Sequence, residues 1–464
     1  MLRFVVFIAC LVCLHQPLHA QVRAAPPSSA RDTTSVVGSW SGALALGPST
    51  LEVLFHVDAD SAGTYSATMD VPAQGARGIP VSRVEVTPDS LHLVIQPING
   101  RYDGARIAAD SIQGTWTQNG QSFPLDLTPV PDSVDTSPNR PQTPEPPFPY
   151  RTEKVTFENP EADITLEGTF TRPESAGPHP AVVLVSGSGP QSRDSEVAAH
   201  KLFLVVADHL TRQGIAVFRY DERGVGASEG TFATATTDDL ARDAQAAVER
   251  IAARDDVRSV GLYGHSEGGW VAPMVDAHSD AVDFLVLMAP PAVPGAALIT
   301  EQRARITEAQ GAPAATVDSV RAQQDRVTAG VASAPDSAAA ARHIQASLET
   351  IGLPQNQIDA QIRAMTTPWF RYFVSNDPAE VLRQVDVPVL ALFAENDLQV
   401  LPEQNRPPLE AALETSDSPG VTVDTVPGMN HLFQPSSTGR LSEYAQIETT
   451  MAPTVLERIT TWIQ

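Results

Sequence analysis

Cysteine is nearly absent from this sequence, which contains only two cysteines in 464 residues. Both of them, Cys10 and Cys13, lie in an apolar N-terminal run that we expect to be removed. A mature chain without cysteine has no disulfide, no thiol nucleophile and no thiolate metal site. These absences leave hydroxyl, imidazole and carboxylate groups as the candidates for chemistry.

Lysine is also scarce, because Lys154 and Lys201 are the only two lysines and the other basic residues are arginines. The formal net charge is −24, which argues against nucleic acid or an anionic membrane surface as a partner, since both would be repelled. An acidic, lysine-poor surface stays soluble in high salt, whereas a GC-rich genome gives the same composition for a different reason. Both explanations remain open.

Long hydrophobic runs are missing except at the N-terminus. Residues 4–14 are apolar after the positive start at Arg3, and Ala20 offers a small residue for cleavage before Gln21. The run is too short to span a bilayer, so residues 1–20 are typical of a secretory signal peptide. We therefore expect an exported protein, periplasmic or extracellular, with no stable membrane anchor.

Short alternating segments fill residues 36–130, where turn-forming Gly, Asp, Asn and Pro separate the runs of β-branched and apolar residues. This pattern predicts a small antiparallel β-domain, barrel-like in form. Its opening, Gly38 and Trp40, faintly resembles the Gly-x-Trp start of lipocalin-type proteins, which would imply a cavity for a small apolar ligand. The alternative is that Trp40 is an ordinary core residue.

The flanks of this region have few groups that can pack. Residues 21–35 are small and polar and predict a flexible leader, and residues 131–150 are so rich in proline that we expect an extended linker.

From residue 151 to residue 464 strands and helices alternate. Apolar runs such as 181–185, 259–263, 284–288 and 388–393 are separated by helical stretches, which predicts an α/β domain with a doubly wound, mostly parallel sheet. The stretch 292–378 is longer than a strand-to-strand crossover needs. We expect it to form a helical lid over the carboxyl edge of the sheet.

Ser266 lies at the turn between the strand 259–263 and the apolar segment that begins at Trp270. Glycines stand two residues to either side, at Gly264 and Gly268, so neighbouring backbone can pass close to a strained serine. The helix that follows would present its unpaired N–H groups to a developing negative charge. A glycine-rich turn without chemistry is the alternative, and the strand-turn-helix context favours a nucleophile.

A serine nucleophile needs a base and an acid that orients the base. Asp397 and His431 follow the next two predicted strands, and the chain order Ser266, Asp397, His431 is that of α/β-hydrolases. On these three motifs residues 151–464 resemble bacterial α/β-hydrolase esterases of the serine aminopeptidase-like group. Glu395 lies in the same loop as Asp397 and is the second candidate for the acid.

The resemblance implies an oxyanion hole made by the backbone N–H groups of Glu267 and Ser188. The chain departs from the family pattern at Ser186, where a histidine is usual, and at Ala394, where a glycine is common. The resemblance also marks residues 221–228 as a loop of the fold, which we interpret as structural because its glycines suit tight turns.

A nucleotide site is the alternative for the Gly-x-Gly at residues 187–189. The rest of a nucleotide-binding pattern is missing there, so we set that alternative aside. We expect no cofactor and no metal. Arg193 and Asp194 either line the pocket or form a surface ion pair.

The predicted activity is cleavage of small-molecule esters with small or medium acyl chains. Amide or aminopeptide hydrolysis with the same triad, or ligand binding by an inactive hydrolase domain, are the alternatives, and the oligomeric state is open.

Overall fold

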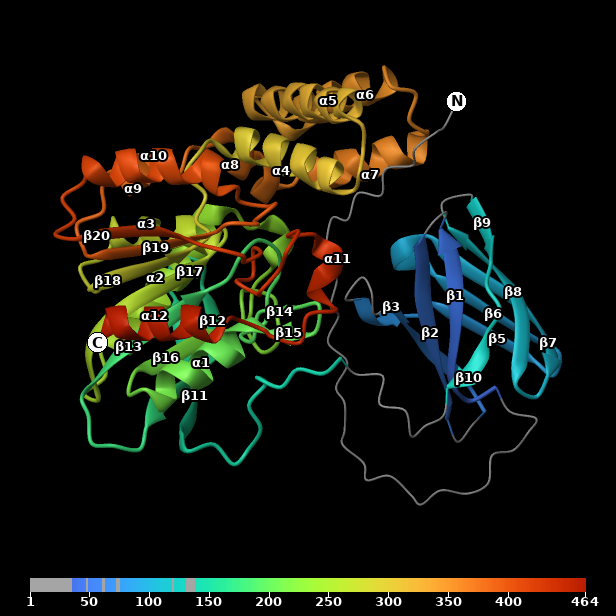
Figure 1. The fold of residues 1–464 in the computed structure, drawn as a ribbon, viewed down its shortest axis with the longest axis horizontal. Helices are drawn as coiled ribbons and strands as arrows, with labels where there is room; N and C mark the ends of the chain where they lie inside the picture. The colour runs from blue at the N-terminus through green and yellow to red at the C-terminus, as the bar shows by residue number, and fades with distance from the viewer. Residues whose placement is uncertain (1–35, 47–48, 61–62, 72–75, 119–120, 131–137) are drawn as a thin grey trace.

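The computed structural model describes residues 36–46, 49–60, 63–71, 76–118, 121–130 and 138–464 (Figure 1). The expected signal peptide 1–20 and leader 21–35, with both cysteines, lie outside the described residues, as do residues 131–137 of the expected linker.

Two antiparallel sheets build the N-terminal region, so its prediction as an all-β region is confirmed. The first sheet has the order β10-β1-β2-β3-β4 and comprises β1 (Gly38–Leu46), β2 (Ser49–Ala59), β3 (Tyr65–Val71), β4 (Ala76–Pro80) and β10 (Thr128–Val130). The second has the order β5-β6-β7-β8-β9 and comprises β5 (Arg83–Thr87), β6 (Ser90–Ile95), β7 (Gly100–Ala108), β8 (Ser111–Gln118) and β9 (Gln121–Pro124), with a short helix η2 (Gln96–Ile98).

One apolar core lies between these sheets because alternate side chains of each strand point inward. In β6, for example, Leu91, Leu93 and Ile95 are fully buried. Trp40 is buried in the same core, and its Nε1–H donates to the Val36 carbonyl at 2.9 Å. Its environment is that of a core tryptophan.

The proline-rich segment differs from the prediction over its second half. Residues 138–149, which we call the strap, are not a free linker, because Arg140 and Gln142 form hydrogen bonds with residues 445–451 near the C-terminus. Proline stiffens the chain and does not prevent polar side chains beside it from binding backbone groups.

The remaining chain forms an eight-stranded sheet in the order β11-β12-β16-β13-β17-β18-β19-β20. Its strands are β11 (Tyr150–Asn159), β12 (Ile164–Pro173), β13 (His179–Val185), β16 (Ala216–Tyr220), β17 (Val257–His265), β18 (Phe284–Met288), β19 (Val389–Ala394) and β20 (Val421–Val426). Strand β12 runs in the opposite direction to the other seven strands of this sheet. The predicted doubly wound, mostly parallel sheet is confirmed, and its strand order is that of the α/β-hydrolase fold.

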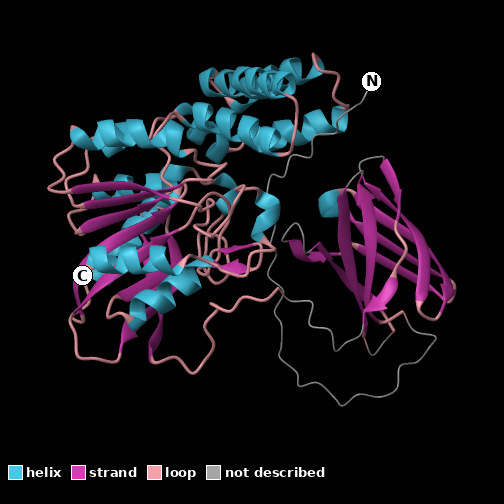
Figure 2. Ribbon diagram, in the orientation of Figure 1, coloured by secondary structure: helices cyan, strands magenta, loops and turns pink. Residues whose placement is uncertain are grey.

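Helices cover both faces of this sheet, which explains why β13 and β19 are buried along their whole length (Figure 2). On one face α1 (Leu202–Arg212) contacts α12 (Pro453–Ile463), and on the other α2 (Thr237–Ala252) contacts α3 (Gly268–Asp276). A capping box between Thr236 and Asp239 begins α2. Smaller elements are β14 (Glu196–Val197), β15 (His200–Lys201), η3 (Phe232–Thr234), α10 (Pro402–Glu414) and α11 (Leu441–Tyr444).

A group of helices is inserted between β18 and β19, and Figure 1 shows it stacked beyond one edge of the sheet. It contains α4 (Gly295–Ala309), α5 (Ala314–Ser333), α6 (Ser337–Glu349), α7 (Gln355–Met365), α8 (Pro368–Ser375) and α9 (Ala379–Leu382). Helices α5 to α8 share a small apolar core of their own, separate from that of the sheet.

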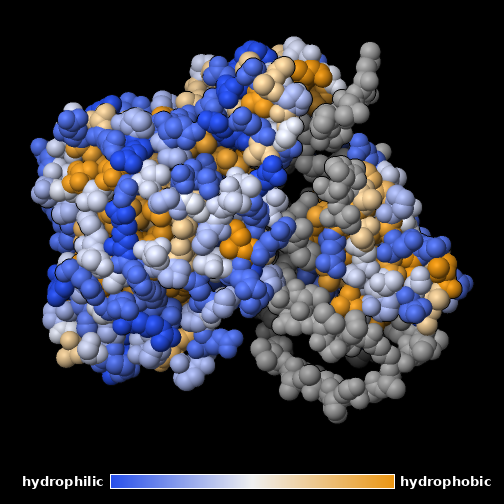
Figure 3. Space-filling view, viewed as in Figure 1, coloured by the Kyte–Doolittle hydropathy of each residue, from blue (hydrophilic) through white to orange (hydrophobic). Residues whose placement is uncertain are grey.

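The visible face of the molecule is mainly hydrophilic, and hydrophobic residues form small separate patches on it (Figure 3). Within the described part of the chain, no helix is both long enough and apolar enough to cross a membrane.

Candidate active site

Ser266 is held in a left-handed backbone conformation, with φ of +56°, at the turn between β17 and α3. A non-glycine residue rarely adopts this conformation, and its N–H is fixed here by the Met288 carbonyl at 2.9 Å. A Cβ on Gly264 would overlap the Gly268 carbonyl, and one on Gly268 would overlap the Val185 carbonyl. Both glycines are therefore required by close backbone approach.

His431 and Asp397 are joined by a hydrogen bond of 2.7 Å from Nδ1 to Oδ2, and both side chains are buried. The other carboxylate oxygen, Oδ1, accepts from the backbone N–H groups of Gln399 at 2.7 Å and Val400 at 3.0 Å. With the acid fixed in this way, the hydrogen bond to Asp397 directs the proton of a neutral imidazole to Nδ1 and leaves Nε2 as the acceptor. That is the tautomer of a general base.

Glu395 has a different position from Asp397, although the two share one loop. Its side chain is exposed, and its Oε2 accepts from the Gly428 N–H at 2.7 Å. Glu395 therefore braces the turn that precedes His431 and does not contact the imidazole through a hydrogen bond.

The base lies beside the turn that carries Ser266, which we call the elbow, because β17 and β20 both end at the same edge of the sheet. His265, the residue before Ser266, donates from Nε2 to the His431 carbonyl at 2.9 Å, and the two rings lie 4.8 Å apart. Burial first, and the neighbouring His431 second, lower the pKa of His265 to about 3, so it is neutral. Among the described hydrogen bonds none joins Ser266 Oγ to His431 Nε2, a contact that often tightens only when substrate binds.

The predicted oxyanion donors lie against the nucleophile. A Cβ on Gly187 would stand 3.1 Å from Ser266 Cβ, so the loop that carries Ser188 passes directly by the serine. Within the described structure, no backbone hydrogen bond uses the N–H of Ser188 or of Glu267. Both groups are therefore unused donors next to Ser266.

The Glu267 side chain connects the turn at Ser266 to two other segments by hydrogen bonds, which sequence reasoning missed. Its Oε1 accepts from Thr237 Oγ1 at 2.7 Å and from Trp369 Nε1, on the inserted helix α8, at 2.8 Å. Its Oε2 is buried without a hydrogen bond of ordinary length among the described residues, although the Ser188 hydroxyl is close enough to favour the charged form. Burial outweighs these donors and raises the pKa of Glu267.

Ser186, where the family usually has histidine, donates from Oγ to Glu222 Oε1 at 2.6 Å. The other oxygen of Glu222 accepts from the Gln191 N–H at 2.8 Å. Burial raises the pKa of Glu222 to about 8 against these two hydrogen bonds, which favour the charged form. Glu222, just after the end of β16, thus binds both ends of the loop 186–191, which carries the predicted oxyanion donor Ser188.

Arg193 and Asp194 are not a surface pair with each other. Arg193 binds Asp221 at 2.6 Å and Glu167 at 2.9 Å, whereas Asp194 pairs with the buried Arg219. Both residues therefore fix the loop after β13 to neighbouring strands. Among the described hydrogen bonds and ion pairs, none joins either side chain to Ser266, Asp397 or His431.

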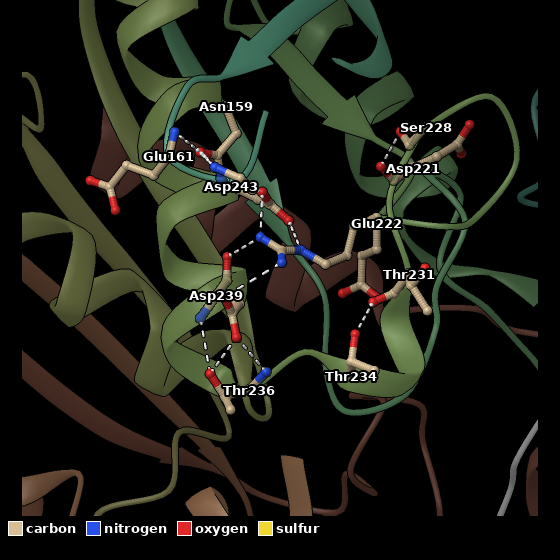
Figure 4. A network of polar contacts seen from close by, with 12 residues as sticks. Asn159, Glu161, Asp221, Glu222, Ser228, Thr231, Thr234, Thr236, Asp239 and Asp243 are labelled. Carbon is tan, nitrogen blue, oxygen red and sulfur yellow. Dashed lines mark hydrogen bonds and ion pairs between the residues drawn. The ribbon is translucent and has the colours of Figure 1, made fainter. Parts of the chain in front are cut away.

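The loop 221–228 is held by buried polar contacts, as its structural interpretation implies (Figure 4). Arg223 Nε donates to Asp243 Oδ2 at 2.6 Å, and Asn159 Nδ2 donates to Asp243 Oδ1 at 2.7 Å. Ser228 Oγ closes the loop by donating to the Asp221 carbonyl at 2.6 Å. Since Glu222 belongs to this loop, the same contacts also hold in place the carboxylate that binds Ser186.

The described residues contain no cluster of three or more His, Cys, Asp or Glu side chains that could hold a metal ion.

Comparison with known proteins agrees with this arrangement. Residues 178–434 match the family model described as serine aminopeptidase, S33. Esterase EstD of Thermotoga maritima is 28% identical over 276 residues, which is 59% of this chain and 60% of the relative's length. The chain thus spans less than two thirds of that curated relative.

Two solved structures that this chain is similar to share less of its sequence. An esterase from Pyrococcus furiosus is 14% identical with a TM-score of 0.43, covering 70% of this chain and 96% of its own. Proline iminopeptidase from Mycobacterium smegmatis is 18% identical with a TM-score of 0.41, covering 67% and 97%. The family match extends over more than half of the chain and includes the elbow, the acid and the base. The chain belongs to the serine aminopeptidase, S33, family of α/β-hydrolases.

Proposed function

We propose that this protein is a serine hydrolase that cleaves carboxylic esters of small or medium acyl chains. The observation that carries the proposal is the 2.7 Å hydrogen bond between His431 and Asp397 beside a serine held at positive φ. In nucleophilic catalysis a buried, fixed acid orients the base, and the base activates a serine that is exposed at a strained, glycine-flanked turn.

In the proposed reaction Ser266 Oγ attacks the ester carbonyl carbon while its proton moves to His431 Nε2. The resulting oxyanion accepts hydrogen bonds from the backbone N–H groups of Glu267 and Ser188. Collapse breaks the carbon–oxygen bond to the alcohol, which takes the proton from His431, and an acyl-enzyme remains on Ser266. Water then attacks the acyl carbon with His431 as base and releases the acid. Asp397 keeps its negative charge throughout and stabilises the imidazolium.

Two alternatives remain to be tested against ester cleavage. The family description names aminopeptidases, and the same triad would hydrolyse an amide. Ester cleavage is favoured because the relative over 276 residues is named an esterase. A ligand-binding protein with an inactive hydrolase domain is disfavoured by a fixed acid and base beside an intact serine.

The inserted helices α4 to α8 supply the proposed acyl specificity. Trp369 of α8 contacts the elbow residue Glu267, so this insertion lies next to the position of the reacting carbonyl. Substitution of its apolar residues should change the preferred acyl length. The signal-peptide pattern of residues 1–20 further supports export to the periplasm or the cell exterior.

The test is a series of p-nitrophenyl esters of increasing acyl length, assayed beside aminoacyl p-nitroanilides. We expect ester hydrolysis with little anilide cleavage, and its loss in Ser266→Ala with the far-UV spectrum unchanged. Ser319→Ala, an exposed serine of α5, is the control and should behave as wild type. Faster anilide than ester cleavage would make the protein a peptidase, and turnover that survives Ser266→Ala would refute the proposal.

A further inference from the structure

The strap, residues 138–149, lies about 300 residues away in sequence from the segment that it contacts. Arg140 donates from Nη1 to the Ile447 carbonyl at 3.1 Å and from Nη2 to the Ala445 carbonyl at 2.9 Å. Gln142 accepts from the Thr450 N–H at 2.6 Å and donates to the Met451 carbonyl at 2.8 Å. Two side chains thus satisfy backbone groups along most of residues 444–452, which we call the base-support segment.

The base-support segment is in turn bonded to the loop that carries His431. The Ala452 N–H donates to the Phe433 carbonyl at 2.9 Å, and Gln434 Nε2 donates to the Thr449 carbonyl at 3.1 Å. Phe433 has φ of +58°, a conformation that a phenylalanine keeps only when its surroundings impose it. These contacts hold the loop in the shape that places His431.

A second route leads to the acid through Tyr444. Its hydroxyl is buried, lies against the His431 backbone and accepts from Gln399 Nε2 at 3.1 Å. The backbone N–H of Gln399 donates to Asp397 Oδ1. The Tyr444 carbonyl accepts from His200 Nε2 at 2.9 Å, and the neutral ring of His200 accepts from Thr450 at its other nitrogen.

We propose that Arg140 and Gln142 are positioning residues for the His431–Asp397 pair, acting through the base-support segment. The inference rests on the proposed serine hydrolase function. Neither residue touches the triad, but each binds backbone groups of the base-support segment, and this segment bonds directly to the loop that carries His431. The exposed backbone of a released segment would exchange these bonds for water, and the loop above it would lose its fixed shape.

The kinetic test compares Arg140→Ala and Gln142→Ala with wild type in the full chain, at a temperature well below each melting point. We expect kcat to fall by about 10- to 100-fold, the loss typical of a displacement near 1 Å at a catalytic group, with KM changed less than about twofold. Arg140→Lys keeps the charge but cannot reach several carbonyl groups at once, so its kcat should be intermediate. Glu145→Ala, exposed in the same strap, should match wild type.

A second readout does not depend on turnover. Hydrogen exchange at the amides of residues 430–434 and 444–452 should accelerate in Arg140→Ala and Gln142→Ala, but not in Glu145→Ala. A lower melting temperature with unchanged kcat, or a raised KM with unchanged kcat, would overturn the proposal. If wild type cleaves no ester, the proposed function fails, and unchanged exchange would separately overturn the role of the strap.

Discussion

At the residue scale, Asp397 owes its position beside His431 to the hydrogen bonds that hold its carboxylate. Two backbone N–H groups hold Oδ1, so Oδ2 has one direction in which to point, and His431 lies there. Glu395 shares the loop, but its carboxylate accepts a hydrogen bond from the Gly428 N–H. The sequence allowed both residues as the acid, because their spacing from the strand differs by only two positions.

Asp397→Asn should therefore lower kcat by roughly 10³- to 10⁴-fold with KM little changed, since the amide keeps the shape but loses the charge that stabilises the imidazolium. Steady-state kinetics on one p-nitrophenyl ester measures this effect. Glu395→Gln is the matched control and should lose less than about tenfold, because its carbonyl oxygen still accepts from Gly428. The reverse ranking would move the acid to Glu395.

Glu222 makes a prediction about pH and stability. Its pKa of about 8 in the folded chain lies above the ordinary value of 4.5, so the native state keeps a proton that the unfolded state releases. The contribution of Glu222 to stability should consequently fall as pH rises from about 4.5 to 8 and level off above that, by at most on the order of 5 kcal/mol. Chemical denaturation at several pH values measures the slope.

Glu222→Gln is the control for that slope. Its amide can donate to Ser186 while its carbonyl oxygen accepts from the Gln191 N–H, so the loop keeps its contacts. The variant should lose most of the wild-type decrease between pH 5 and 8. An identical slope in both proteins would show that Glu222 is ionised in the fold at neutral pH.

At the scale of elements, the sheet was predictable and the contacts between elements were not. Apolar runs and the glycines around Ser266 indicate buried strands and a tight turn because these depend on local sequence. The hydrogen bond from Trp369 to Glu267 depends on how α8 packs over α3. The two residues are about one hundred positions apart in the sequence. A tryptophan in a helical insertion carries no signal for that partner.

Trp369→Phe removes the Nε1–H donor and keeps an aromatic ring beside Phe373. We expect kcat to fall about tenfold, equivalent to about 1.4 kcal/mol, because Glu267 also carries an oxyanion N–H on its backbone. Tyr372→Phe removes a hydroxyl from the same helix without touching Glu267 and should be silent. Equal kinetics for the two variants would mean that the insertion does not position the elbow.

At the scale of the whole molecule, the N-terminal β-region and the eight-stranded sheet have apolar cores built from separate stretches of the chain. Residues 36–127 contribute the first core and residues from 155 onward contribute the second, beside the small core shared by α5 to α8. Composition and alternation predicted this division, since an antiparallel and a parallel sheet differ in their apolar patterns. The prediction of a free linker was wrong over residues 138–149. Arg140 and Gln142 bind backbone groups of residues 445–451, and any sequence offers such groups, so the sequence carries no signal for this contact.

Cleavage of the folded protein at a protease site placed within residues 131–137 should therefore leave the strap with the hydrolase part. We expect kcat/KM on a p-nitrophenyl ester to stay within about twofold, because separate cores make the two parts independent folding units. The control is an uncut protein with the same inserted site. Loss of activity on cutting would show that the N-terminal β-region takes part in shaping the site.

The central claim is that Ser266 is a nucleophile activated by His431 and Asp397. Intact-mass and peptide mass spectrometry after treatment with a fluorophosphonate tests this claim without knowledge of the natural substrate. We predict one adduct per chain, located on Ser266, formed far more slowly in Asp397→Asn and absent in Ser266→Ala. An adduct on another residue, or no adduct on a folded wild-type chain, would contradict the account.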